Sequence, residues 1–117
     1  VGLGSDIAGG HVLSLFQVMV GAVQASKLRW RLEDDSQKPL TVDEVFYLGT
    51  KGGGAFFGQV GSFEKGYEFD AVIMDDSRLK TPRKLTLKER LERVVYLSDD
   101  RDVRGKYVAG RKIFAAI

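Results

Sequence analysis

The residues most able to do chemistry lie at the beginning of the chain, where an apolar run reaches one carboxylate and then a glycine pair. Val1 and Leu3 can face one side of a short strand, and Asp6 falls where such a strand would end. Gly9 and Gly10 supply the backbone freedom that a tight loop needs. Because α/β folds place chemistry at the carboxyl ends of parallel strands, Asp6 is a candidate for a functional role. These residues alone favour the alternative, an aspartate that caps a turn.

Few other side chains could bind a metal ion. A catalytic zinc or iron site needs at least three protein ligands, usually histidines and carboxylates. The chain has one histidine, His11, and no cysteine. His11 could be a second ligand, or it could line a substrate pocket with Gly9 and Gly10. In either case we expect this chain alone to retain no metal and to be inactive.

Three stretches show helical spacing of apolar residues, and each opens with a capping-box pattern. The longest is residues 14–33, in which Gln17 follows Ser14 by three positions. The others begin at Thr41 and at Thr86 and extend to about residues 51 and 98. The sequence therefore predicts three helices.

Glycines and short apolar runs mark the remaining elements. No Lys-Ser/Thr pair follows the run Gly52–Gly54 and no strand precedes it, so it does not fit a phosphate-binding loop. We expect it to end or interrupt the second helix and to allow close backbone packing, with a short helical turn at 55–58. Strands are predicted at 71–74, 103–108 and 111–116, the last two joined by a turn in which Gly110 has a positive φ.

Charge and composition narrow the class of protein. The chain has 117 residues, with 18 basic and 16 acidic side chains and a net charge of +2. This balance does not favour nucleic acid or membrane partners, and the basic cluster at 27–31 is followed directly by acidic residues. No run is apolar and long enough to span a bilayer. The lack of cysteine excludes disulfides and fits a reducing, cytoplasmic location.

The chain lacks an initiating Met and begins in a strand-like run. A parallel strand needs neighbours on both sides, and none precedes this one. We therefore expect the chain to be the C-terminal part of a longer enzyme.

Three motifs follow one another along the chain: Gly2–Gly10 around Asp6, Gly61–Met74 with Phe69-Asp70, and Tyr96–Arg101 with Asp99-Asp100-Arg101. Together they resemble the amidohydrolase superfamily, and all three are similar to guanine deaminases in particular. Ser98 stands where those enzymes have glycine.

The resemblance implies an α/β fold. Residues 1–58 would hold the last strand and helices of a metal-dependent (β/α)8 barrel, and residues 59–117 the C-terminal strands of its β-sandwich with one short helix. Standing alone, the chain would be α+β.

The resemblance also implies hydrolytic deamination of guanine to xanthine and ammonia. Asp6 would bind one divalent metal, zinc or iron, and would orient and help deprotonate the attacking water, while Asp70 would be structural. The expected partners are the missing N-terminal part of the enzyme, the purine substrate and further copies of the enzyme in a homo-oligomer. The alternatives are another amidohydrolase, a deaminase or chlorohydrolase of a related heterocycle, or a non-catalytic α+β assembly module.

Overall fold

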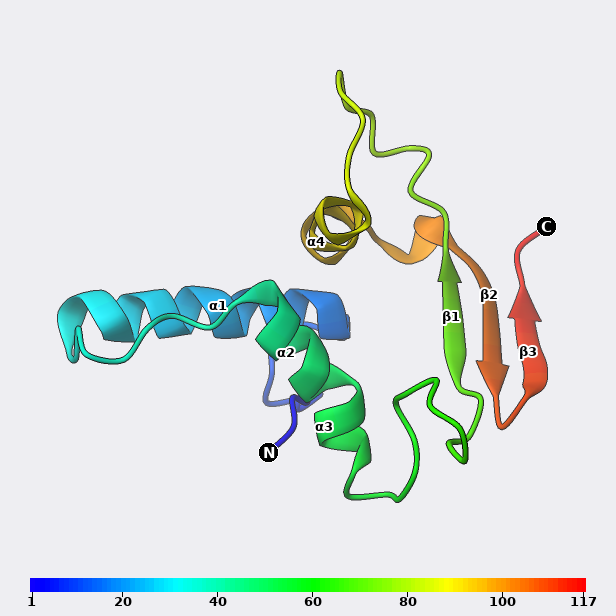
Figure 1. Ribbon diagram of the computed structural model, residues 1–117, viewed down its shortest axis with the longest axis horizontal. Coiled ribbons are helices and arrows are strands. Elements are labelled where there is room, and N and C mark those ends of the chain that lie inside the picture. The colour runs from blue at the N-terminus through cyan, green and yellow to red at the C-terminus, as the bar shows by residue number, and fades with distance from the viewer. The chain divides into compact units, whose positions relative to one another are not determined.

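The computed structural model describes residues 1–117, which form two compact units, residues 1–54 and 55–117. The first unit holds α1 (Leu15–Leu32), α2 (Val42–Gly49) and α3 (Lys51–Gly54). The second holds β1 (Ala71–Met74), α4 (Leu87–Leu97), the 3-10 turn η1 (Asp100–Asp102), β2 (Val103–Val108) and β3 (Arg111–Ala115), as Figure 1 shows. No helix combines the length and the apolar character that crossing a membrane requires.

The core of the first unit lies between α1 and α2. Met19 and Val23 of α1 and Val45 of α2 are its buried apolar side chains. Gly49 allows the close approach of the two helices, because a Cβ at this position would overlap the methyl group of Met19. The apolar stripe predicted for the first helix therefore packs against the second helix.

Two of the three predicted capping boxes form, and the third does not. The backbone N–H groups of Thr41 and Thr86 donate to the carboxylates of Glu44 and Glu89 at 2.7 and 2.8 Å, and both threonine hydroxyls accept in return. Ser14 is the N-cap of α1 as predicted, but its side chain makes no capping hydrogen bond.

The glycine run forms the last three residues of α3, and the helix that begins at Thr41 is interrupted before the run, not by it. α2 stops at Gly49, and Thr50 leaves the helical path with φ −124° and ψ −100°. The N–H of Gly54 then donates to the carbonyl of Thr50 at 2.8 Å, which makes residues 51–54 one turn of helix. Residues 55–58 form a turn and a bend, not the expected helical turn.

The strand expected at residues 1–6 does not form. This segment pairs with no other strand, and the N–H of Leu3 donates instead to the carbonyl of Leu48 at 3.1 Å. Gly2 and Gly53 permit this approach, since a Cβ on Gly2 would lie 2.5 Å from Cα of Gly53. A parallel strand needs parallel neighbours, and the sheet in this chain is antiparallel throughout.

The second unit is organised by a three-stranded antiparallel sheet in the order β1-β2-β3. The predicted strands and hairpin are confirmed, with φ of +48° at Ala109 and +75° at Gly110 in the turn. The Asp70 carboxylate accepts the N–H of Ala109 at 2.8 Å, and the carbonyl of Phe69 accepts that of Gly110 at 2.9 Å. Asp70 thus attaches the β2–β3 turn to the start of β1, which is a structural role.

Candidate functional site

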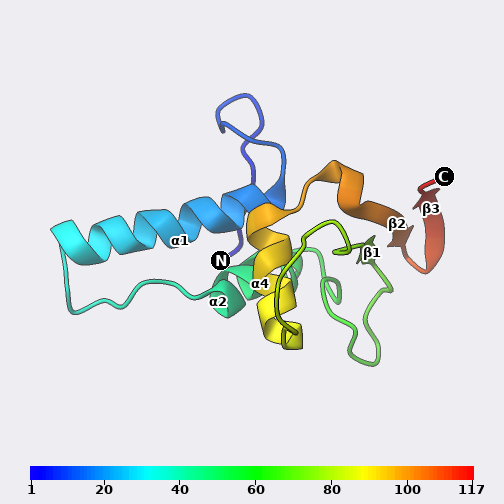
Figure 2. The same ribbon diagram turned by 90° about the horizontal axis from the view of Figure 1, so that it is seen from above.

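Asp6 lies in a tight turn before α1. Its φ is +46°, and that of Ala8 is +82°. Residues other than glycine rarely adopt such positive φ angles. The carbonyl of Asp6 accepts the N–H groups of Gly9, at 2.9 Å, and of Gly10. Figure 2 shows this loop standing away from the N-terminal end of α1. Positive φ angles at residues with side chains concentrate at functional sites, where the surrounding structure holds them in place.

The glycine pair allows the turn to close on Asp6. A Cβ on Gly9 would lie 2.6 Å from Oδ2 of Asp6, and one on Gly10 would overlap the carbonyl oxygen of Ser5. The sequence therefore requires glycine at both positions for steric reasons. The structure brings Asp6, Gly9 and Gly10 together in a single turn.

The Asp6 carboxylate is exposed and accepts no hydrogen bond within the chain. His11 is also exposed and makes no hydrogen bond or ion pair. No three His, Asp or Glu side chains of the chain come together as a metal-binding group. A metal site requires at least three protein ligands, and the donor groups at this loop are enough for only one of them.

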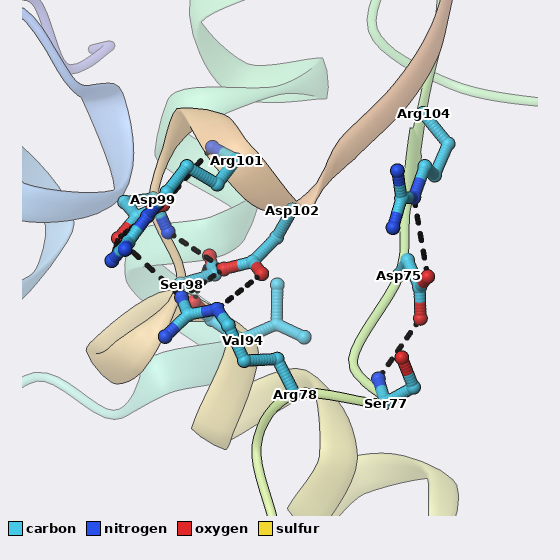
Figure 3. A network of polar contacts seen from close by, with 9 residues as sticks. All are labelled: Asp75, Ser77, Arg78, Val94, Ser98, Asp99, Arg101, Asp102 and Arg104. Atoms are coloured by element: carbon cyan, nitrogen blue, oxygen red, sulfur yellow. Dashed lines mark hydrogen bonds and ion pairs between the residues drawn. The ribbon is translucent and has the colours of Figure 1, made fainter. Parts of the chain in front are cut away.

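A second cluster of charged residues surrounds η1 and contains the one buried charge, Asp102, which is 3% exposed. Arg78 binds both of its carboxylate oxygens, through Nε at 2.9 Å and Nη2 at 2.6 Å, and the N–H of Asp99 donates to it at 3.0 Å. Figure 3 shows these side chains facing one another, with Arg101 on Asp99. Arg78 holds the pKa of Asp102 below its ordinary value, and Arg101 lowers the pKa of Asp99 to about 2.

This cluster accounts in structural terms for Asp99 and Arg101 of the Asp99-Asp100-Arg101 motif. The carbonyl of Asp102 also accepts the N–H of Asp75 at 2.8 Å, so the end of β1 is joined to the start of β2. Ser98, in the position where the resemblance predicts glycine, donates its hydroxyl to the carbonyl of Val94 at the end of α4. The sequence alone does not predict the pairing of Arg78 with Asp102, because 24 residues separate the two and no local pattern connects them.

The sequence matches the Amidohydrolase family over residues 1–113. It is 36% identical to a guanine deaminase of Dictyostelium discoideum and 33% identical to one of Homo sapiens, in both cases over 97% of this chain. A crystal structure of guanine deaminase from C. acetobutylicum, with guanine bound in its active site, matches 97% of the chain with a TM-score of 0.91 and 51% identity. The E. coli guanine deaminase matches with a TM-score of 0.80 and 29% identity.

The chain spans about a quarter of these proteins, namely 26% of the Dictyostelium protein, 27% of the human protein and 27% of the C. acetobutylicum chain. The match includes the Asp6 turn, the Phe69-Asp70 segment and the Asp99-Asp100-Arg101 motif, all of which lie within residues 1–113. The resemblance predicted from these motifs is confirmed: the chain belongs to the amidohydrolase family.

Proposed function

We propose that this chain is the C-terminal part of a metal-dependent guanine deaminase, an enzyme that converts guanine and water to xanthine and ammonia. The observation that carries this proposal is the TM-score of 0.91, at 51% identity, to a guanine deaminase solved with guanine in its active site. In this proposal residues 1–58 complete the catalytic barrel and residues 59–117 belong to the adjoining β-sandwich.

Asp6 is the residue of this chain to which we assign chemistry. Its carboxylate is free of hydrogen bonds and exposed, so its lone pairs are available to one divalent metal, zinc or iron. Such a metal, when bound, lowers the pKa of water from its bulk value to about 7. Asp6 would orient the attacking water and accept its proton. Addition of that water to the carbon carrying the exocyclic amine, transfer of the proton to the departing nitrogen and loss of ammonia would complete the reaction.

The turn around Asp6 supports this role by fixing the main chain from which the carboxylate projects. Two backbone N–H groups bind the Asp6 carbonyl, and the main chain is held at a positive φ. A catalytic group held in one orientation before substrate arrives is more effective than a mobile one. We assign Gly9, Gly10 and His11, which follow in the same loop, to the lining of the substrate pocket.

The experiment that tests the assignment compares Asp6→Asn with Asp35→Asn in the complete enzyme. Asp35 is an exposed aspartate of the same unit whose carboxylate makes no hydrogen bond, so it controls for loss of one charge. We expect Asp6→Asn to lower kcat for guanine by about a thousandfold or more, since it removes a metal ligand and the proton acceptor together. Asp35→Asn should retain full activity.

Elemental analysis and circular dichroism of both variants accompany the kinetics. Near-normal turnover of Asp6→Asn with normal metal content would refute the role of Asp6. A higher kcat/KM of the unmodified enzyme for another amino- or chloro-substituted heterocycle would refute guanine as the substrate and leave Asp6 in place. The isolated chain should neither deaminate guanine nor retain stoichiometric metal.

A further inference from the structure

The second unit contains an open pocket of about 410 Å³ between α4 and the loop at residues 75–86 that precedes it. The chain around this pocket is strongly basic, since residues 78–93 include seven Lys or Arg and two Glu. Five of these basic residues line the pocket, together with Leu79 and Leu85. The pocket is therefore a positively charged surface in a protein whose overall charge is nearly balanced.

The loop that forms one wall is held to α4 by ion pairs. Arg90 binds both carboxylate oxygens of Asp76, at 2.7 and 2.9 Å, and Arg83 binds both of those of Glu89, at 2.6 and 3.3 Å. Arg93 donates to two loop carbonyls at 3.0 and 3.3 Å. Two-pronged arginine–carboxylate pairs restrict geometry as well as adding energy. The wall thus has a defined shape although it contains no helix or strand.

These contacts engage the three arginines of the pocket and leave its two lysines without a partner. Lys80 and Lys84 make no ion pair and no side-chain hydrogen bond, and both are exposed. Leu79 and Leu85, each next to one of these lysines in sequence, are partly exposed and also line the pocket. The pocket therefore offers two unpaired positive charges beside two apolar side chains.

We propose that this pocket binds an acidic segment of a partner protein, with two carboxylates pairing with Lys80 and Lys84 and an apolar side chain contacting Leu79 and Leu85. Charge complementarity of this kind selects and steers partners more than it adds affinity. No aromatic residue lines the pocket, whereas proteins that bind single-stranded nucleic acid stack bases on aromatic rings. No buried polar side chain points to a site for a small anion. This proposal does not depend on the deaminase activity.

The test measures binding of a fluorescent synthetic peptide of alternating Glu and Leu to the full-length protein, by anisotropy. The double variant Lys80→Glu/Lys84→Glu should bind at least about tenfold more weakly, which corresponds to about 1.4 kcal/mol. The matched control is Lys27→Glu/Lys38→Glu, which makes the same change of charge at two exposed lysines of the first unit. This control should bind as the unmodified protein does. Increasing salt should weaken binding, because ions screen exposed charge pairs.

If the two double variants have equal thermal stability, the weaker binding of Lys80→Glu/Lys84→Glu does not result from unfolding. A peptide of alternating Lys and Leu should not bind. The proposal is overturned if the Glu-Leu peptide does not bind, or if both double variants lose affinity equally. Tighter binding of a single-stranded oligonucleotide, or displacement of the peptide by low concentrations of inorganic phosphate, also overturns it in favour of those ligands.

Discussion

At the residue scale, Gly9 controls the position of the Asp6 carboxylate. The space that a Cβ would occupy on Gly9 is 2.6 Å from Oδ2 of Asp6, so Gly9→Ala must displace that carboxylate. If Asp6 acts as proposed, a displacement near 1 Å should lower kcat of the complete enzyme by about a hundredfold. Steady-state kinetics with guanine measure this effect.

Gly4→Ala is the control for that substitution. Gly4 belongs to the same segment, and a Cβ there would meet no atom within 4 Å. It should leave kcat unchanged. Equal activity of the Gly9 and Gly4 variants would show that the orientation of Asp6 does not matter to turnover.

Among the charged residues of the second unit, Asp102 should contribute most to its stability. Asp102→Asn removes a buried negative charge and one acceptor of Arg78, and it leaves the guanidinium partly unpaired. Asp102 is buried although the Arg78 side chain is 44% exposed, so removing its charge and one acceptor should be destabilising, and Tm should fall by several degrees. Thermal unfolding, monitored by circular dichroism, measures Tm. Asp100→Asn, at an exposed neighbour in η1, should change Tm little, and equal effects would contradict the importance of the Arg78 contact.

At the element scale, the beginning of α4 shows how capping and an ion pair combine on one side chain. Glu89 accepts the N–H and hydroxyl of Thr86 at 2.8 and 3.1 Å and also binds Arg83. Arg83 first, and Thr86 second, lower the pKa of Glu89 from 4.5 to about 2. The helix is therefore stabilised most when this carboxylate is charged.

The direction of the pH effect follows from that lowered pKa. Because folding favours the charged form of Glu89, its contribution is complete above pH 4.5 and is lost as the pH falls toward 2. The lowered pKa of Asp99 acts in the same direction. We expect Tm to fall when the pH is lowered from 7 to about 3. Glu89→Gln should reduce this fall, and Glu92→Gln should reduce it less; equal slopes for the two variants would contradict the prediction.

At the scale of the whole molecule, the sheet has two unprotected edges. β1 and β3 each pair on one side only, and Val72 and Ile113 on these strands are 56% and 57% exposed. Unpaired strand edges with exposed apolar residues favour association. We expect the isolated chain to self-associate, which sedimentation across a range of concentrations would detect. Ile113→Lys should reduce association, because charged residues on edge strands oppose pairing. A strictly monomeric chain would contradict this expectation.

Membership of the amidohydrolase family is also a property of the whole chain. It could be predicted because the three family motifs occur in the expected order along the sequence. The Asp6 turn, the Phe69-Asp70 segment and the Asp99-Asp100-Arg101 motif lie within the matched residues. The catalytic role of Asp6 stays a prediction, since no other His, Asp or Glu side chains gather with it into a metal-binding group. The arrangement of a barrel likewise depends on strands that these residues do not contain.

The sequence by itself determined the features whose causes are local. The capping boxes at Thr41 and Thr86 depend on side chains three residues apart, and the hairpin turn at Ala109–Gly110 depends on a residue that tolerates positive φ. These interactions need only neighbouring residues, so the sequence patterns predicted the turn and two of the three capping boxes, while the box at Ser14 does not form.

Only the tertiary structure decided the rest, because the responsible contacts join residues far apart in the chain. The glycine run became helical where Gly2 meets Gly53, although glycine is a poor helix former. Asp102 could be buried because Arg78, 24 residues earlier, neutralises it. Which distant groups meet depends on how helices and strands pack, and the free energy of that packing outweighs the local preferences of single residues.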